Sequence, residues 1–140
     1  MPETMRAVIC REPLDYRLEE VPVPRAEAGE VVVEVKACGI CASDIKCYTG
    51  APLFWGDEHR RPFVQAPVIA GHEFIGEVVE LGDGAGEKHG IQLGDTAIAE
   101  QIVPCWECRY CLRGRYNMCE SALSIHYTWC WHRNQFICPV

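Results

Sequence analysis

The sequence lacks three features that would each point to a class of protein. It contains no run of about 18 consecutive apolar residues, so we expect no membrane-spanning segment. It has no surplus of basic residues, because 13 Lys and Arg stand against 20 Asp and Glu, and the formal net charge of −7 argues against a nucleic-acid-binding protein. The first ten residues, which include Glu3 and Arg6, lack the apolar stretch of a signal peptide. We therefore expect a cytoplasmic protein that binds neither nucleic acid nor a membrane.

Cysteine is the residue type present in excess, with ten copies in 140 residues. In a secreted chain this number would predict a disulfide framework. In a cytoplasmic chain thiols stay reduced, and clustered cysteines are more often metal ligands. The remaining composition, 49% hydrophobic and 24% charged, is that of a globular domain long enough to bury a core. Composition therefore predicts a globular metal-binding protein.

Short strands dominate the pattern of the first 100 residues. The best candidate covers residues 30–37, which are β-branched and partly alternating, and further strands are expected over 6–10, 16–21, 67–70, 75–81 and within 93–99. A short helical turn is expected to start near Ser43 and Asp44, whose side chains suit a helix N-cap. Residues 50–67 and 82–86 are rich in turn-forming residues and are predicted to be a long loop and a turn. Many short strands with glycine turns predict a mainly β fold, a small barrel or a sandwich.

Four cysteines follow one another closely as C-x2-C-x2-C-x7-C, namely Cys105, Cys108, Cys111 and Cys119. Four thiolates match the tetrahedral preference of a structural zinc ion, and such a closed shell leaves no position for a substrate. An iron–sulfur cluster is the main alternative. Its common bacterial spacing closes with a three-residue gap and a proline, whereas here the last gap is seven residues and Glu120 follows. The spacing therefore favours structural zinc.

A second set of metal-ligating residue types is spread along the chain. Cys41 follows the best predicted strand, and His72 comes 31 residues later, at the end of another predicted strand. One Cys, one His and a further ligand, with the fourth position open, form a known catalytic zinc arrangement. Taken singly, a histidine is more often a hydrogen-bonded structural residue and a cysteine a small buried one.

Together, these motifs resemble the N-terminal catalytic domain of the zinc-dependent medium-chain alcohol and polyol dehydrogenases. The resemblance rests on residues 39–44, residues 71–76, Gly94-Asp95 and the four-cysteine lobe, and it runs from about residue 5 to residue 120. It implies a GroES-like β-barrel over residues 1–120, with a zinc lobe at 105–119. It also implies NAD(P) as cofactor, two zinc ions per full-length subunit, and homo-oligomers.

The resemblance also implies roles for single residues. Cys41 and His72 match two ligands of the catalytic zinc, and Glu73 matches a carboxylate that lies beside the metal. Ser43 matches the hydroxyl that takes the proton from the alcohol, and Asp44 matches the carboxylate that orients the ligand histidine. The four cysteines of the lobe match the structural zinc ligands. The third ligand of the catalytic zinc is expected downstream of the barrel segment.

Two parts of the chain bear on the branch of the family. Lys46 stands where many relatives have a histidine that passes the proton onward, and we interpret it as a solvated surface lysine. Residues 50–67, with Phe54, Trp55 and His59, resemble the polyol and diol branch. Their aromatic side chains either line a substrate cleft or pack the loop onto the barrel. Within that branch erythritol or threitol is the leading substrate, beside sorbitol and butanediol.

The sequence also lacks the glycine fingerprint of a nucleotide-binding domain. Residues 82–86 offer its first two glycines, but Glu87 stands where the third is required. Residues 121–140 contain none of the acidic residues of the chain and do not continue the family's pattern. We hypothesise that a frameshift or truncation replaced the rest, which leaves residues 121–140 as an atypical tail.

The sequence thus predicts the catalytic-domain portion of a zinc-dependent, NAD(P)-dependent alcohol or polyol dehydrogenase, which oxidises a small-molecule alcohol by hydride transfer. We expect the 140-residue chain to be inactive by itself, because it lacks the nicotinamide site and one zinc ligand. The alternative is a non-catalytic zinc-binding module that serves assembly or partner contact.

Overall fold

The protein, seen here as a computed structural model, is built from two antiparallel sheets. The structure describes residues 2–60, 62, 64, 66–99, 104–120 and 137–139. One sheet has the strand order β2-β1-β4 and the other β3-β5-β6-β7. The strands are β1 (Thr4–Glu12), β2 (Asp15–Pro22), β3 (Val31–Cys38), β4 (Val68–Ile69), β5 (Phe74–Leu81), β6 (Thr96–Ala99) and β7 (Ile137–Pro139). Every described strand pair is antiparallel, which confirms the predicted mainly β fold.

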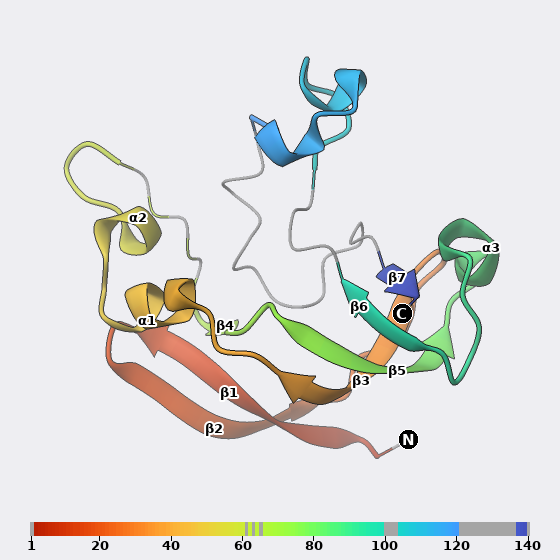
Figure 1. Cartoon of the computed structure of the whole chain (residues 1–140). Coiled ribbons are helices and arrows are strands. Elements are labelled where there is room, and N and C mark those ends of the chain that lie inside the picture. Colours follow the sequence, from red (N-terminus) through yellow and green to blue (C-terminus); the bar gives the residue numbers. More distant parts are fainter. Residues whose placement is uncertain are drawn as a thin grey trace.

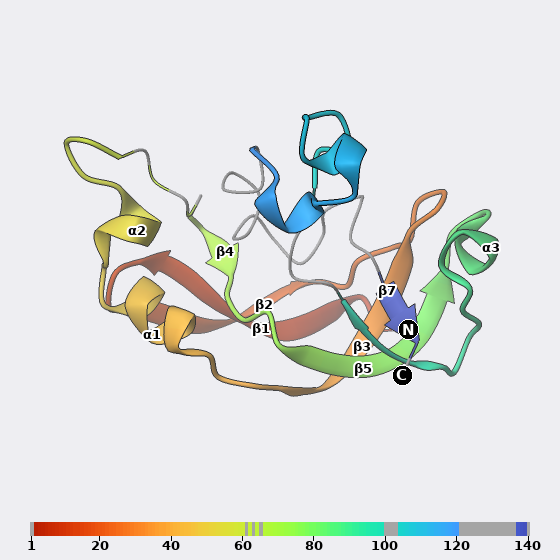
Figure 2. The same cartoon turned by 45° about the horizontal axis from the view of Figure 1, so that its top comes forward.

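Short helices lie at the two ends of the sheets (Figures 1 and 2). α1 (Ala42–Tyr48) and α2 (Pro52–Trp55) sit together at one end, and α3 (Ala85–His89) sits at the other. The single turns η1 (Cys111–Arg113) and η2 (Tyr116–Met118) belong to the cysteine lobe, which both views show apart from the sheets. Among the described residues, no helix is long and apolar enough to cross a membrane.

A backbone hydrogen bond joins the turn of the β1–β2 hairpin to the last residue of α1. The turn places Leu14 at a φ of 64°, and the Leu14 N–H donates to the Tyr48 carbonyl over 2.8 Å. Below the turn, a core cluster joins β1 to both helices; its buried members are Cys10, Cys47, Phe54, Val64 and Val68. The hairpin thus binds the last turn of α1, and the core cluster packs against Cys47 of the same helix. These contacts position the residues of its first turn.

The pairing of β3 with β5 forms the other half of the framework. It contains two register shifts, and Gly76 lies opposite Val35 between them. A Cβ on Gly76 would lie 2.5 Å from the Glu34 carbonyl oxygen, so only glycine fits this close strand approach. At the far end of the pair Cys38 opposes Phe74. The residues that follow β3 therefore lie beside the residues that precede β5.

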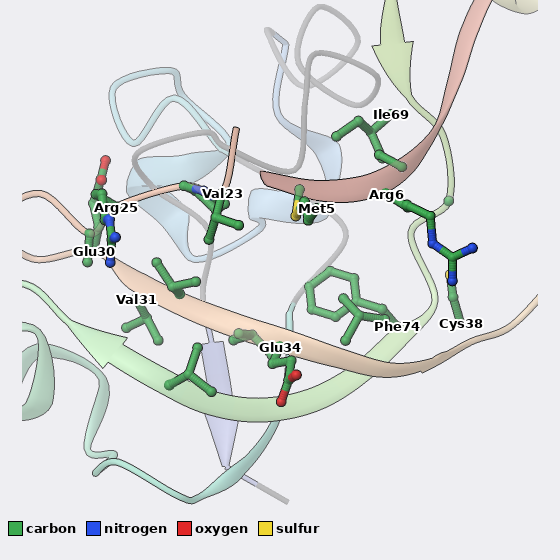
Figure 3. A pocket seen from close by; sticks show the side chains of 18 of the residues that line it. Met5, Arg6, Val23, Arg25, Glu30, Val31, Glu34, Cys38, Ile69 and Phe74 are labelled. Atoms are coloured by element: carbon green, nitrogen blue, oxygen red, sulfur yellow. The ribbon is translucent and has the colours of Figure 1, made fainter. Parts of the chain in front are cut away.

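An apolar cavity of about 760 Å³ lies between the two sheets. Met5, Val23, Val31, Ile69 and Phe74 are among its lining residues, as Figure 3 shows.

Three local expectations need correction. The stretch predicted as a loop contains α2, which has a proline at its start, where the missing N–H costs nothing. The predicted turn at 82–86 leads into α3, which is bounded by Gly84 and Gly90 in left-handed conformations. The N-cap of α1 is Cys41, whereas Ser43 and Asp44 lie within its first turn.

The predicted boundary at residue 120 stays a prediction. Residues 121–136 lie outside the described part of the chain. Ile137–Pro139 form β7, which pairs with β6 in the second sheet.

Candidate metal centres

Three ligand types from distant parts of the sequence meet at the end of the β3–β5 pair. One ligand atom each from Cys41, His72 and Glu73 lie within 4.8 Å of one another. Cys41 and His72 are partly buried and Glu73 is exposed. The structure therefore brings together the two predicted zinc ligands and the predicted neighbouring carboxylate.

The strand register explains this meeting. Beyond the Cys38–Phe74 pair the Gly39 N–H donates to the Glu73 carbonyl over 2.9 Å, which carries the ladder one step further. Cys41 then begins α1, and its backbone N–H donates to Asp44 Oδ2 over 2.8 Å. A carboxylate that accepts an N–H in the first turn stabilises the helix start. The same bond holds Cys41 in place.

His72 has a partner on each side of its ring. Nδ1 lies 3.3 Å from Asp44 Oδ1, and Nε2 lies 3.4 Å from Ser43 Oγ. The side chains of His72 and Asp44 are only 19% and 16% exposed, so the pair is largely shielded from water. A carboxylate beside Nδ1 favours a proton on that nitrogen and leaves the Nε2 lone pair available to a metal.

The donor set fits zinc. Thiolate sulfur, imidazole nitrogen and carboxylate oxygen are its three usual protein ligands, and three of them leave one position open. In a tetrahedral site the ligand atoms lie about 3.3–3.8 Å apart, given zinc–ligand distances of about 2.0–2.3 Å. The ligand atoms here are at most 4.8 Å apart, so metal binding requires them to approach one another by at most about 1.5 Å. The third ligand, which we expected downstream of the barrel segment, has a candidate in Glu73.

The four lobe cysteines form a second group. Their sulfur atoms lie within 4.8 Å of one another, and Cys105 Sγ and Cys111 Sγ are 3.9 Å apart. Four sulfurs around one zinc ion would be about 3.8 Å apart. The backbone N–H groups of Cys105 and Cys108 donate to Cys119 Sγ and Cys105 Sγ, each over 3.3 Å. The four cysteines that the sequence spacing singled out thus form a compact group of sulfur atoms that could hold a metal ion.

Backbone hydrogen bonds also affect the ionisation of one lobe thiol. The N–H groups of Cys111 and Glu120 lower the pKa of Cys108 to about 6, whereas burial raises the pKa of Cys111. Thiolates are the form in which cysteine binds a metal. Arg109 pairs with Glu120 at 2.8 Å and lies over the Tyr110 ring, so this arginine has partners outside the sulfur group.

The aromatic residues of the 50–67 segment divide between core and surface. Phe54 is 3% exposed within the core cluster beneath α1, and Trp55 packs against that cluster while its indole N–H donates to the Cys47 carbonyl over 2.7 Å. The His59 side chain is 84% exposed. For Phe54 and Trp55 the packing interpretation is therefore the correct one. Lys46 is exposed, in line with a surface lysine.

Sequence reasoning missed two features near this site. A buried group under α1 combines the thiols of Cys10 and Cys47 with the Tyr16 ring, and burial raises the pKa of each of the three. Only the alternation of apolar residues in β1 could have indicated it. The second feature is the close approach of Gly39 to Glu73, for which a single glycine gives no signal.

The apolar cavity between the sheets is distinct from the metal group. It reaches Cys38 and Gly71, but Cys41, His72 and Glu73 are not among the residues that line it.

Known proteins that are similar in sequence to this chain include dehydrogenases of small polyols and diols. The chain is 58% identical over 120 residues to an erythritol/L-threitol dehydrogenase of Mycolicibacterium smegmatis, a match that covers 86% of this chain and 33% of that protein. It is 37% identical over 119 residues to an (R,R)-butanediol dehydrogenase of Bacillus subtilis, with 84% and 32% covered. The chain thus spans about a third of the length of these relatives.

Solved structures show the same fold. A zinc-binding dehydrogenase from Sinorhizobium meliloti bound to NADP superimposes with a TM-score of 0.76 at 26% identity, over 99% of this chain and 37% of that one. The 2R,3R-butanediol dehydrogenase of Bacillus subtilis gives 0.66 at 35% identity, over 85% and 34%. These relatives do not favour the alternative of a non-catalytic module. The profile of the alcohol dehydrogenase GroES-like domain matches residues 27–137, and the chain belongs to this family.

Proposed function

We propose that this chain is the metal-binding N-terminal portion of a zinc-dependent dehydrogenase that oxidises a small polyol with NAD(P). The observation that carries the proposal is the meeting of Cys41, His72 and Glu73, with Ser43 and Asp44 on the two sides of the histidine ring. When bound, zinc would supply Lewis acidity toward a substrate hydroxyl, and NAD(P), held by the rest of a full-length enzyme, would accept hydride.

Each residue of the site has a separate task in this proposal. Cys41, His72 and Glu73 hold the metal and leave one position for the substrate oxygen. Asp44 keeps the His72 ring in place and keeps the proton on Nδ1. Ser43 Oγ lies 3.4 Å from Nε2, and it would accept the proton of the substrate hydroxyl while it passes its own hydroxyl proton on toward solvent. The lobe cysteines hold a second zinc ion, which stabilises the fold and takes no part in the reaction.

The substrate class rests on the relatives. The 58% identity to an erythritol/L-threitol dehydrogenase supports a four-carbon polyol as the leading substrate. Similarity to butanediol and sorbitol dehydrogenases supports a vicinal diol as the recognised unit. The resemblance of residues 5–120 supports a domain over residues 1–120 with 121–140 as an atypical tail, whereas the family profile extends to residue 137. We also propose that the full-length enzyme is a cytoplasmic homo-oligomer.

The metal part of the proposal is tested by the zinc content of the purified chain. We expect two zinc ions per chain, one after Cys41→Ser, and one after Cys108→Ser. The serine variants serve as each other's control, because each should remove one ion and leave the other. A single ion in the unchanged chain that survives Cys41→Ser would refute the Cys41 site.

The catalytic part of the proposal is tested with the two thirds of the relatives' length that this chain does not span. The 120 residues of this chain that are 58% identical to the Mycolicibacterium erythritol/L-threitol dehydrogenase can replace the corresponding third of that enzyme. We expect the chimera to reduce NAD(P) with erythritol or threitol, and the same chimera with Ser43→Ala to fall by about 100-fold or more in kcat. A correctly assembled chimera with two zinc ions and no turnover on any polyol would contradict the proposed activity.

A further inference from the structure

Gly39 stands between the end of β3 and the ligand Cys41, and it touches the third candidate ligand. Its N–H donates to the Glu73 carbonyl over 2.9 Å. Its φ lies outside the left-handed region that favours glycine, so the backbone alone does not require glycine here. Another reason must account for the glycine at this position.

That reason is the space next to Glu73. A Cβ on Gly39 would lie 2.8 Å from Glu73 Oε2 and 3.3 Å from Glu73 Cβ. Real side chains do not approach a Cβ to 2.8 Å, so an alanine at position 39 and the present carboxylate position exclude each other. The nearest atom is the end of a flexible side chain, which can turn away at small cost.

Two other glycines close to the site differ in this respect. At Gly76 the added Cβ would meet the backbone of Glu34, which cannot turn away. At Gly71, which has a φ of 104°, any side chain would be strained by the backbone itself. Substitution at those positions disturbs the fold, whereas substitution at Gly39 moves one carboxylate.

We propose that Gly39 is a positioning residue that keeps the Glu73 carboxylate within reach of the metal held by Cys41 and His72. The absence of a side chain at position 39 lets Glu73 complete a set of three ligands at the end of the sheet. A side chain at this position leaves a two-ligand site. The inference rests on the proposed function, because it needs a metal ion at Cys41 and His72.

The test is a cobalt(II) titration of the full 140-residue chain against a competing chelator. The thiolate-to-cobalt absorption band and the weaker visible bands report binding at each site. We expect Gly39→Ala to weaken binding at the Cys41 site by about 10- to 100-fold and to change its visible bands, while the four-cysteine site keeps its spectrum. Glu73→Gln should weaken the same site, and Gly39→Ala should add no further loss on top of it.

The matched control is Gly86→Ala. Gly86 also lies outside the left-handed region, its nearest outside atom is the Ile91 carbonyl oxygen at 3.2 Å, and it belongs to α3 at the other end of the sheets (Figure 1). This variant should bind cobalt at both sites like the unchanged chain.

Each result decides one question. If the unchanged chain binds no metal through Cys41, the proposed function fails and not only the role of Gly39. If the unchanged chain binds and Gly39→Ala matches it in affinity and spectrum, the positioning role is refuted. Additive losses in the double variant would also refute it, because Gly39 would then act independently of Glu73. Loss of the four-cysteine spectrum in Gly39→Ala would show a general disturbance of the fold and would equally overturn the inference.

Discussion

Replacing Asp44 by asparagine separates two tasks of one carboxylate. Oδ2 accepts the Cys41 N–H over 2.8 Å, and Oδ1 lies 3.3 Å from His72 Nδ1. Asparagine retains a carbonyl oxygen for Cys41, but it presents an NH2 group, a donor, to Nδ1. A donor at Nδ1 favours the histidine tautomer with its proton on Nε2. This tautomer has no lone pair on the nitrogen proposed to bind the metal.

The expected effects differ in size and in kind. Loss of the partner of a metal-binding histidine typically weakens metal affinity by about 10- to 100-fold, or about 1.4–2.7 kcal/mol. The bond to Cys41 survives in Asp44→Asn, so the free energy of unfolding of the metal-free chain should change by less than about 1 kcal/mol. Asp44→Ala loses the bond as well and should destabilise the metal-free chain by about 1.5–3 kcal/mol.

Two measurements check this prediction. Cobalt(II) titration against a chelator gives the affinity of the Cys41 site, with the four-cysteine site as internal reference. Urea denaturation of the metal-free chain gives the free energy of unfolding. Unchanged metal affinity in Asp44→Asn would refute the orienting role of Asp44, and equal destabilisation by both variants would refute its role at the helix start.

Three further predictions concern stability. Gly76→Ala should lower the free energy of unfolding by more than about 2 kcal/mol, because its Cβ would lie 2.5 Å from the Glu34 carbonyl oxygen; an unchanged urea midpoint would contradict the strand geometry. Burial raises the pKa of Cys47 from 9.0 to about 11, so the unfolded chain loses this proton first as the pH rises. The free energy of unfolding should therefore be unaffected by this thiol below pH 9 and should fall by about 2–3 kcal/mol between pH 9 and 11. A Cys47→Ala variant with the same loss of stability over this pH range would show that Cys47 is not the group responsible. Arg11→Ala breaks an exposed bidentate ion pair with Glu19 at 2.8 Å, and it should lower the free energy of unfolding, measured with urea, by less than about 1 kcal/mol. A larger decrease would contradict the expectation that solvent weakens this ion pair.

The strands and the approximate place of α1 were predictable, whereas α2 and α3 were not. Residues 30–37 are β-branched and carry their own preference for a strand, so β3 was expected within one residue at each end. α2 has four residues and α3 has five. At these lengths a helix shows no periodic apolar face, and its existence depends on what Phe54 or Ala85 packs against.

The start of α1 shows how a local rule can mislead. Ser43 and Asp44 have side chains that suit an N-cap, but the helix begins earlier and Asp44 reaches back to the Cys41 N–H from its first turn. The choice between these arrangements depends on where β3 ends and on the contacts that hold the last turn of α1 to the hairpin.

The sequence by itself determined the four-cysteine group, because its ligands lie within fifteen residues and a short loop must bring them together. It also supplied Cys41, His72 and Glu73 as candidates, through their motifs and the resemblance. Only the tertiary structure decided that their three ligand atoms meet and that Gly39 leaves room for the Glu73 carboxylate. Cys41 and Glu73 are 32 residues apart in the sequence, and the register of β3 against β5 determines whether they meet. The alternation of apolar residues restricts the register of each strand, but the β3–β5 pair contains two register shifts that only the contact between these distant strands decides.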